Sequence, residues 1–208
     1  MIKTHLRWSY LTIFAFVGSF LYITLTAVSI SYYPGPFGPL TNYLSQLGNS
    51  SLNPEGAIFY NLALFCTGIS VIPATIAIYK FYSNDKNKKI LVSVVICGFF
   101  NGLSIVMAGV FNEDFSELHF IWSMIIFLTL IPLLFLTNIG LWNHQDYSRS
   151  IGLYGLSLGI FDMIFVAYVV IWGTNSGAIL EWITIFVYIS WFILVSIQIL
   201  YRERNVSN

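Results

Sequence analysis

The segment from Tyr32 to Tyr60, YYPGPFGPLTNYLSQLGNSSLNPEGAIFY, decides how this chain is organised, because it separates two long apolar runs. It contains prolines at positions 34, 36, 39 and 54, and no Lys or Arg. Proline lacks a backbone donor and fixes φ, so a helix that enters this segment is expected to end there. The segment is therefore predicted to be a turn-rich connection between two helices.

The composition predicts an integral membrane protein. Of the 208 residues, 57% are hydrophobic and 9% are charged, whereas an average soluble domain has about 25% charged residues. Lipid accepts so apolar a surface once the backbone polar groups are bonded within helices. The formal net charge is zero and the basic residues form no stripe, which argues against nucleic acid as a partner.

Six apolar runs reach or approach the ~20 residues that a helix needs to cross a bilayer. The sequence therefore predicts an all-α polytopic membrane protein, a bundle of six transmembrane helices that forms a single domain over residues 1–208. The predicted spans are residues 8–30, 56–79, 90–111, 119–142, 151–172 and 181–201. The first run is longer than the core of a signal peptide, so it is interpreted as a span.

Short connections predict that successive spans are antiparallel neighbours. Small residues let transmembrane helices approach closely, and they recur in the third and fifth spans, which are therefore expected to be central. These residues are Gly98, Gly102, Ala108, Gly109, Gly152, Gly155 and Gly159.

The basic residues all flank the same ends of the predicted spans. They are Lys3, Arg7, Lys80, Lys86, Lys88, Lys89, Arg149, Arg202 and Arg204. Short loops rich in Lys and Arg stay in the cytoplasm, so both termini are predicted to be cytoplasmic in a multi-pass protein of the cell membrane. Loops 31–55, 112–118 and 173–180 are then extracytoplasmic, and they hold carboxylates but no basic residue.

A short amphipathic helix is predicted inside the first extracytoplasmic loop, at the membrane interface or in the mouth of the bundle. Its apolar residues recur at i, i+3, i+4 and i+7, and Gly48 ends it. They are Leu40, Tyr43, Leu44 and Leu47. Farther along, Asn53-Pro54-Glu55 is typical of a helix start, with Asn53 as the N-cap of the second span.

The junction of the third and fourth spans holds the candidate catalytic residues Glu113, Asp114 and His119. A carboxylate and an imidazole at a membrane edge can share a proton or hold a polar headgroup. A structural alternative stays open for Asp114, because Asp114 and Glu117 have the spacing of a capping box at the start of the fourth span.

Ser45, on the polar side of the predicted interfacial helix, is a candidate nucleophile. His119 would be its base and Glu113 or Asp114 the carboxylate that orients the base, although no glycine pattern of a nucleophile elbow surrounds Ser45. Three further polar residues predicted on the same face are candidate ligand-binding residues: Asn42, Gln46 and Glu181.

Asp162 is the carboxylate predicted to lie deepest in a span, and Asn101 is expected at similar depth. Intramembrane carboxylates usually face the bundle interior and have a partner. The pair is interpreted as a hydrogen bond that joins the third and fifth spans, with a proton or ion relay as the alternative.

No metal site and no cofactor are predicted. His5 and His144 are assigned to the opposite side from His119, and zinc usually binds more nitrogen or sulfur ligands than one face offers. Cys66 and Cys97 are expected to be free thiols that pack like small apolar side chains.

Several short motifs resemble those of a known family. They are Asn42–Gly48 (NYLSQLG), Asn53–Glu55 (NPE), Phe59–Asn61 (FYN) and Gly109–Phe111 (GVF), followed by Asp114 and His119. They resemble a family of six-span prokaryotic membrane proteins, domain of unknown function 998, and more distantly the Frag1/DRAM/Sfk1-like membrane proteins of eukaryotes. The eukaryotic group implies a lipid-facing role. Gln46 stands where that group often has Asp, which argues against a carboxylate role at this position.

Three functional hypotheses follow. The first is a pocket on the extracytoplasmic face, between residues 40–48 and the start of the fourth span, that binds or processes a membrane lipid or another amphiphile. The second is a scaffold or complex subunit that binds a protein partner or forms a homo-oligomer. The third is a small proton-coupled transporter that uses Asp162.

Overall fold

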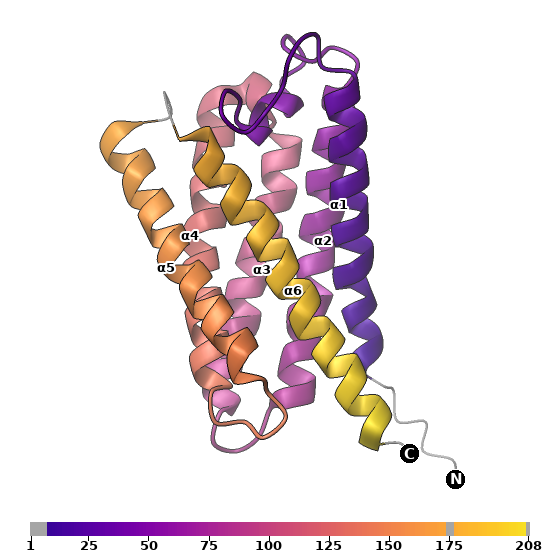
Figure 1. Cartoon of the computed structure of the whole chain (residues 1–208), viewed down its shortest axis with the longest axis vertical. Helices are drawn as coiled ribbons and strands as arrows, with labels where there is room; N and C mark the ends of the chain where they lie inside the picture. The colour runs from indigo at the N-terminus through magenta and orange to yellow at the C-terminus, as the bar shows by residue number, and fades with distance from the viewer. Residues whose placement is uncertain (1–7, 174–176, 207–208) are drawn as a thin grey trace.

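The protein is an all-α bundle of long apolar helices (Figure 1). The computed structural model describes residues 8–173 and 177–206. Within them the long helices are α1 (Ile13–Ser31), α2 (Ala57–Tyr82), α3 (Lys88–Val110), α4 (Ser116–Gly140), α5 (Arg149–Trp172) and α6 (Ala178–Val206). Short 3₁₀ helices are η1 (Trp8–Thr12), η2 (Leu44–Gly48) and η3 (Glu113–Phe115). The six long helices are candidate membrane spans by length and hydropathy, as predicted.

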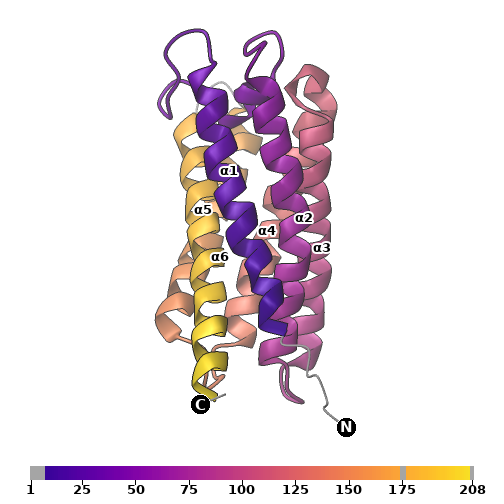
Figure 2. The ribbon, with the colours of Figure 1, turned by 90° about the vertical axis from the view of Figure 1, so that its right-hand side faces the viewer.

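Helices that follow one another along the chain pack side by side, and α6 closes the bundle against α1 and α2. In Figure 1, α6 runs obliquely across the front of the bundle, and Figure 2 shows α1 beside α6. Large apolar side chains cover the outside: Phe20, Ile58 and Val170 are 67%, 68% and 70% exposed. An apolar exterior of this kind requires lipid around it.

Helices α2 and α3 approach each other closely at facing glycines. A Cβ atom added to Gly102 would lie 2.6 Å from the carbonyl oxygen of Gly68, and a Cβ atom added to Gly68 would meet Gly102 in the same way. The glycines of the third span therefore allow backbone-to-backbone packing, as predicted. The expectation that α3 and α5 are central was wrong, because α2 and α6 bury the largest share of their apolar stretches.

The first long loop differs from the predicted two-turn amphipathic helix. Only Leu44–Gly48 is helical, as one turn of 3₁₀ helix, while Leu40 is 81% exposed. The backbone turns at Gly38, whose carbonyl oxygen accepts from Asn42 N–H, and Tyr43 is extended. The i to i+7 pattern therefore spans a break in the helix, and only Leu44 and Leu47 are buried.

Asn53 is not the N-cap of α2, because Gly56 occupies that position. Its side-chain amide instead donates to the Ser29 carbonyl oxygen (3.2 Å), the Ser29 hydroxyl (3.0 Å) and the Leu47 carbonyl oxygen (3.1 Å). Asn53 thus fastens the end of η2 to the end of α1. The predicted cap requires the Asn53 side-chain oxygen to accept from the first turn of the helix, but α2 begins only at Ala57 and that oxygen has no hydrogen-bond partner among the described residues.

The two ends of the bundle differ in charge. We call the end that holds loops 32–56 and 111–115 and the start of α6 the acidic end, because Glu55, Glu113, Asp114, Glu117 and Glu181 lie there. The basic end holds the α2–α3 and α4–α5 loops and the end of α6, with every lysine and arginine whose side chain is described. Which end faces the cytoplasm stays a prediction from the charge pattern.

Candidate functional site

A cavity of about 240 Å³ opens at the acidic end between η2, η3, α4, α5 and α6. Its polar wall includes five site residues that were predicted from the sequence, four of them on the loops and α4 and one on α6. These residues are Ser45, Gln46, Glu113, His119 and Glu181. Its apolar wall comes from α4 and α5 and includes Phe120, Met124, Phe127, Phe165, Val166 and Val169. We call this space the large cavity.

A smaller cavity of about 60 Å³ continues from the large one toward the bundle core. Both cavities are lined by Ser45, His119, Ser123, Phe127 and Glu181, so they adjoin each other. Beyond these shared residues the small cavity reaches Tyr22, Thr184 and Tyr188. Five of the predicted site residues therefore lie around two adjoining spaces rather than in one hydrogen-bonded cluster, namely Ser45, Gln46, Glu113, His119 and Glu181.

Helix α6 holds η2 over the large cavity. The Glu181 side chain is 7% exposed and its Oε2 accepts the Leu44 backbone N–H at 2.6 Å. The Trp182 indole N–H donates to the Asn42 carbonyl oxygen at 2.9 Å. Two consecutive residues at the start of α6 thus fix the position of Ser45 and Gln46.

Asn42 lies beside the cavity wall and orients Gln46. Its Nδ2 donates to Gln46 Oε1 at 3.1 Å, while its Oδ1 accepts from the Thr41 hydroxyl at 2.7 Å. With Oε1 engaged in this way, the Gln46 amide N–H groups remain as donors at the cavity wall. Asn42 does not line the large cavity, so it acts on the site through Gln46.

The two carboxylates of η3 lie in different surroundings. Glu113 lines the large cavity, and its Oε2 is buried with no hydrogen-bond partner among the described residues. Asp114 instead accepts the Ser50 N–H at 2.8 Å, which joins η3 to the loop after η2. Asp114 therefore neither lines the cavity nor caps α4, whose N-cap residue is Phe115.

His119 connects the start of α4 to the end of α3. Its Nδ1 lies 3.1 Å from the Ala108 carbonyl oxygen and 2.9 Å from the Phe111 carbonyl oxygen. Because both partners are acceptors, Nδ1 carries the proton, and Nε2 of the neutral ring is then an acceptor. Backbone carbonyl groups, and not Glu113 or Asp114, orient this imidazole.

The Ser123 hydroxyl oxygen lies 3.2 Å from His119 Nε2, and Ser123 was not predicted as a site residue from the sequence. Other hydroxyls in these helices bond back to the carbonyl oxygen four residues earlier, as Ser70 does to Cys66 and Ser104 to Phe100. Ser123 instead contacts the side chain of the residue four positions earlier. The feature of the sequence that could have identified Ser123 is its i, i+4 spacing from His119, which places both side chains on one helical face.

The acidic side chains of the site outnumber its basic ones. Glu113 and Glu181 line the large cavity, and no Lys or Arg among the described residues lines either cavity. Partial burial, followed by the Glu181 carboxylate, raises the pKa of Tyr43 to about 12, so this phenol keeps its proton at neutral pH. Among the described residues no group of three or more His, Cys, Asp or Glu side chains is placed to hold a metal ion.

The predicted intramembrane pair is buried but not joined by a hydrogen bond. Asn101 donates to the Ile126 carbonyl oxygen (2.8 Å) and the Thr129 hydroxyl (3.1 Å), and it accepts from Tyr188 (3.3 Å). It therefore connects α3 to α4 and α6. Asp162 is fully buried on α5, and neither carboxylate oxygen has a partner in the part of the chain that the structure describes.

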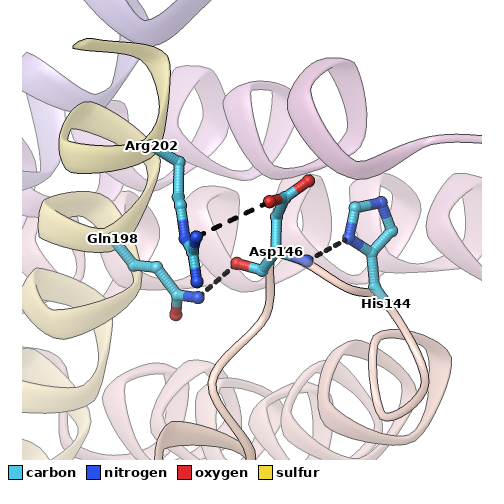
Figure 3. Close-up of polar contacts among 4 residues, drawn as sticks. All are labelled: His144, Asp146, Gln198 and Arg202. Atoms are coloured by element: carbon cyan, nitrogen blue, oxygen red, sulfur yellow. Dashed lines mark hydrogen bonds and ion pairs between the residues drawn. The ribbon is translucent and has the colours of Figure 1, made fainter. Parts of the chain in front are cut away.

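A second polar cluster lies at the basic end (Figure 3). Arg202 on α6 forms an ion pair with Asp146 at 3.9 Å, and the Gln198 amide donates to the Asp146 carbonyl oxygen. The Asp146 N–H in turn donates to His144 Nδ1 at 3.2 Å. These bonds hold the α4–α5 loop against α6, so the cluster has a structural role.

The fold and its apolar exterior define a multi-span helical membrane protein. The family model described as "Protein of unknown function (DUF998)" matches residues 16–198, so the chain belongs to this family. No curated protein and no solved structure matches the chain. The family resemblance predicted from the motifs around η2 and His119 is confirmed.

Proposed function

We propose that the protein binds a lipid or another amphiphile in the large cavity. The polar part of the ligand lies against Ser45, Gln46, Glu113 and Glu181, and its apolar part lies along α4 and α5. The observation that carries this proposal is the division of one 240 Å³ cavity into a polar wall and an apolar wall. Sites for small molecules have this composition, with mostly apolar walls and a few placed polar groups.

The apolar wall lies where a membrane ligand can reach it. Phe120 lines the cavity and is also 48% exposed on the side of the bundle, while Phe165 and Val169 are buried behind it. We expect the acyl chain of a membrane lipid to enter the cavity beside Phe120, so that it stays in apolar surroundings. A ligand without an apolar part would gain nothing from this wall.

Filling the apolar wall tests the proposal. Val166 lines the cavity, whereas Val170, one turn farther along α5, is 70% exposed on the lipid-facing surface. We expect Val166→Trp to abolish co-purification of a lipid in native-membrane extracts measured by mass spectrometry. The matched control Val170→Trp keeps the lipid, because its indole points into the bilayer. Equal lipid content in both variants contradicts the proposal.

A second candidate function, hydrolysis of an ester bond in the bound amphiphile, is favoured by the contact between Ser123 and His119. Ser123 Oγ would attack the carbonyl carbon while His119 Nε2 takes the hydroxyl proton. The alcohol would leave with that proton, and water would then release the acid from Ser123. The proton on His119 Nδ1, held by two backbone carbonyl groups, leaves Nε2 to face Ser123, as this role requires.

Covalent labelling distinguishes Ser123 from the nucleophile Ser45 predicted from the sequence. A hydrophobic fluorophosphonate is expected to label the purified protein at Ser123, so that Ser123→Ala abolishes labelling and Ser45→Ala does not. Labelling that persists in Ser123→Ala, or that is absent from the native protein, argues against hydrolysis. Neither result alters the lipid measurement with Val166→Trp.

A further inference from the structure

We propose that the ligand of the large cavity carries a protonated amino group, so that it is an amphiphilic amine and not an anionic amphiphile. This inference rests on the amphiphile binding proposed above and identifies the headgroup. It follows from the charge of the cavity walls, from the unpartnered polar atoms around them and from the aromatic rings beside them.

The acidic side chains of the walls disfavour an anion. Glu113 and Glu181 line the same cavity, whereas no Lys or Arg among the described residues lines either space and His119 presents Nε2 there as an acceptor. A phosphate or sulfate placed there would meet two carboxyl groups, which offer it no positive charge and repel it when they are ionised. An ammonium group at the same point donates to the carboxyl oxygens and favours their ionised form.

The unpartnered atoms call for a hydrogen-bond donor. Glu113 Oε2 is buried and has no partner among the described residues, and an oxygen of this kind is costly to leave unpaired. Ser123 donates its proton to His119 Nε2, which leaves the lone pairs of its oxygen as acceptors for a ligand. Both residues line the large cavity.

An independent observation comes from the small cavity. Thr184 lines it, is 0% exposed, and has a hydroxyl oxygen without a hydrogen-bond partner in the described part of the chain. A group with several N–H donors, placed where the two cavities meet, has acceptors on both sides. The Glu181 carboxylate lies at this junction, since it lines both cavities.

Aromatic rings in the wall of the large cavity add to the preference for an amine over an anion. Phe120, Phe127, Phe165 and Tyr43 line the large cavity. Cations, with or without N–H donors, are attracted to the faces of such rings, so the rings favour the charge of the amine while the unpartnered oxygens favour its N–H groups. The apolar chain of the ligand then continues along α4 and α5.

The experiment compares probes of equal chain length with the purified full-length protein in zwitterionic nanodiscs. We expect dodecylamine to bind at least tenfold more tightly than dodecanol or dodecyltrimethylammonium, and dodecyl phosphate to give no measurable binding. The trimethyl probe keeps the charge but lacks N–H donors. Binding is followed by the quenching of tryptophan fluorescence and by the shift of the unfolding temperature.

Variants identify the responsible carboxylates. Glu113→Gln and Glu181→Gln are each expected to reduce the preference for dodecylamine over dodecanol at least tenfold. The amide that replaces the Glu181 carboxylate still offers an oxygen to the Leu44 N–H, and the unfolding temperature of each variant reports whether it is folded. The control is Glu117→Gln, an exposed carboxylate in the first turn of α4 that lines neither cavity.

The outcomes separate this inference from the proposed function. Equal affinity for dodecylamine and dodecanol overturns the amine inference and leaves amphiphile binding intact. Stronger binding of dodecyl phosphate overturns it too. Failure of every twelve-carbon probe overturns both, whereas binding of butylamine as tightly as dodecylamine supports the amine and overturns the requirement for an apolar chain.

Discussion

At the basic end of the bundle buried polar side chains bond to one another, whereas at the acidic end several of them face a cavity. Asn138 Oδ1 accepts from the Tyr147 hydroxyl (2.6 Å) and from the Trp191 indole (3.3 Å). At the acidic end, Glu113 and Thr184 each keep a polar atom without a partner among the described residues. In the described part of the chain both ends bury polar atoms, and at the acidic end some of these atoms lie beside the two cavities.

We interpret buried polar side chains that bond to one another as structural, and unpartnered polar side chains beside a cavity as candidates for ligand binding. A buried polar atom costs about 1–3 kcal/mol when it has no partner, so a protein that leaves several of them beside one cavity forgoes stability there. The basic end is not free of such atoms, because Tyr82 and Gln198 each have one. They line neither of the two cavities described above.

The largest expected loss of stability is at the basic end, where the buried polar side chains bond to one another. Asn138→Leu removes the acceptor of two buried donors, Tyr147 OH and Trp191 Nε1, and should destabilise the protein by about 2–4 kcal/mol. The matched change at the acidic end is Asn61→Leu, because Asn61 donates one bond to the Gly48 carbonyl oxygen and its Oδ1 has no partner among the described residues. We expect a loss of at most about 1 kcal/mol there.

SDS-induced unfolding in mixed micelles measures both values. Equal losses for the two leucine variants would remove the contrast between the ends. Amphiphile binding by folded Asn138→Leu should equal that of the native protein, since Asn138 lines neither cavity.

The next effect tests how the roof of the cavity is held. Asn53→Ala breaks three hydrogen bonds from one amide to Ser29 and Leu47, which should cost about 1–3 kcal/mol. Because η2 then separates from the end of α1, amphiphile affinity should fall together with the unfolding free energy. Ser51→Ala, an exposed change in the same loop, is the control. Lost stability with unchanged affinity would show that η2 is positioned from α6 alone.

A smaller effect of opposite sign is expected at the cavity wall. Glu113→Gln removes a charge whose Oε2 is buried and unpartnered among the described residues, so the ligand-free protein should be unchanged or more stable by up to about 1 kcal/mol. Thermal unfolding without added amphiphile measures this change. A clear loss of stability would mean that Glu113 has a structural role, and the acidic end would then resemble the basic one.

Much of the fold was predictable because lipid imposes a strict rule on the sequence. Each predicted span corresponds to a helix, and its ends agree within a few residues, since backbone groups in a bilayer must be bonded within a helix. The loop helix was predicted less well. Leucine spacing alone does not reveal the extended residue Tyr43 that interrupts the pattern, nor the partners that bury Leu44 and Leu47.

The candidate site was predictable in part. Charge and position brought Ser45, Gln46, Glu113, His119 and Glu181 to one end, and all five line the large cavity. Their pairings were not predictable, because His119 binds two backbone carbonyl groups and Asp114 binds a backbone N–H. Backbone partners of this kind leave no trace in residue identities, whereas the i, i+4 spacing of His119 and Ser123 was visible in the sequence.

The smallest expected effect concerns the most visible charge pair of the basic end. Arg202 and Asp146 lie 3.9 Å apart with side chains 44% and 35% exposed, and water screens such a pair, so Arg202→Gln should cost at most about 0.5 kcal/mol. The fastening of the α4–α5 loop then depends on Gln198, whose amide bonds directly to the Asp146 backbone. Gln198→Leu should cost more than Arg202→Gln in the same SDS titration. The reverse order would mean that charge, rather than the satisfaction of buried polar groups, closes the basic end.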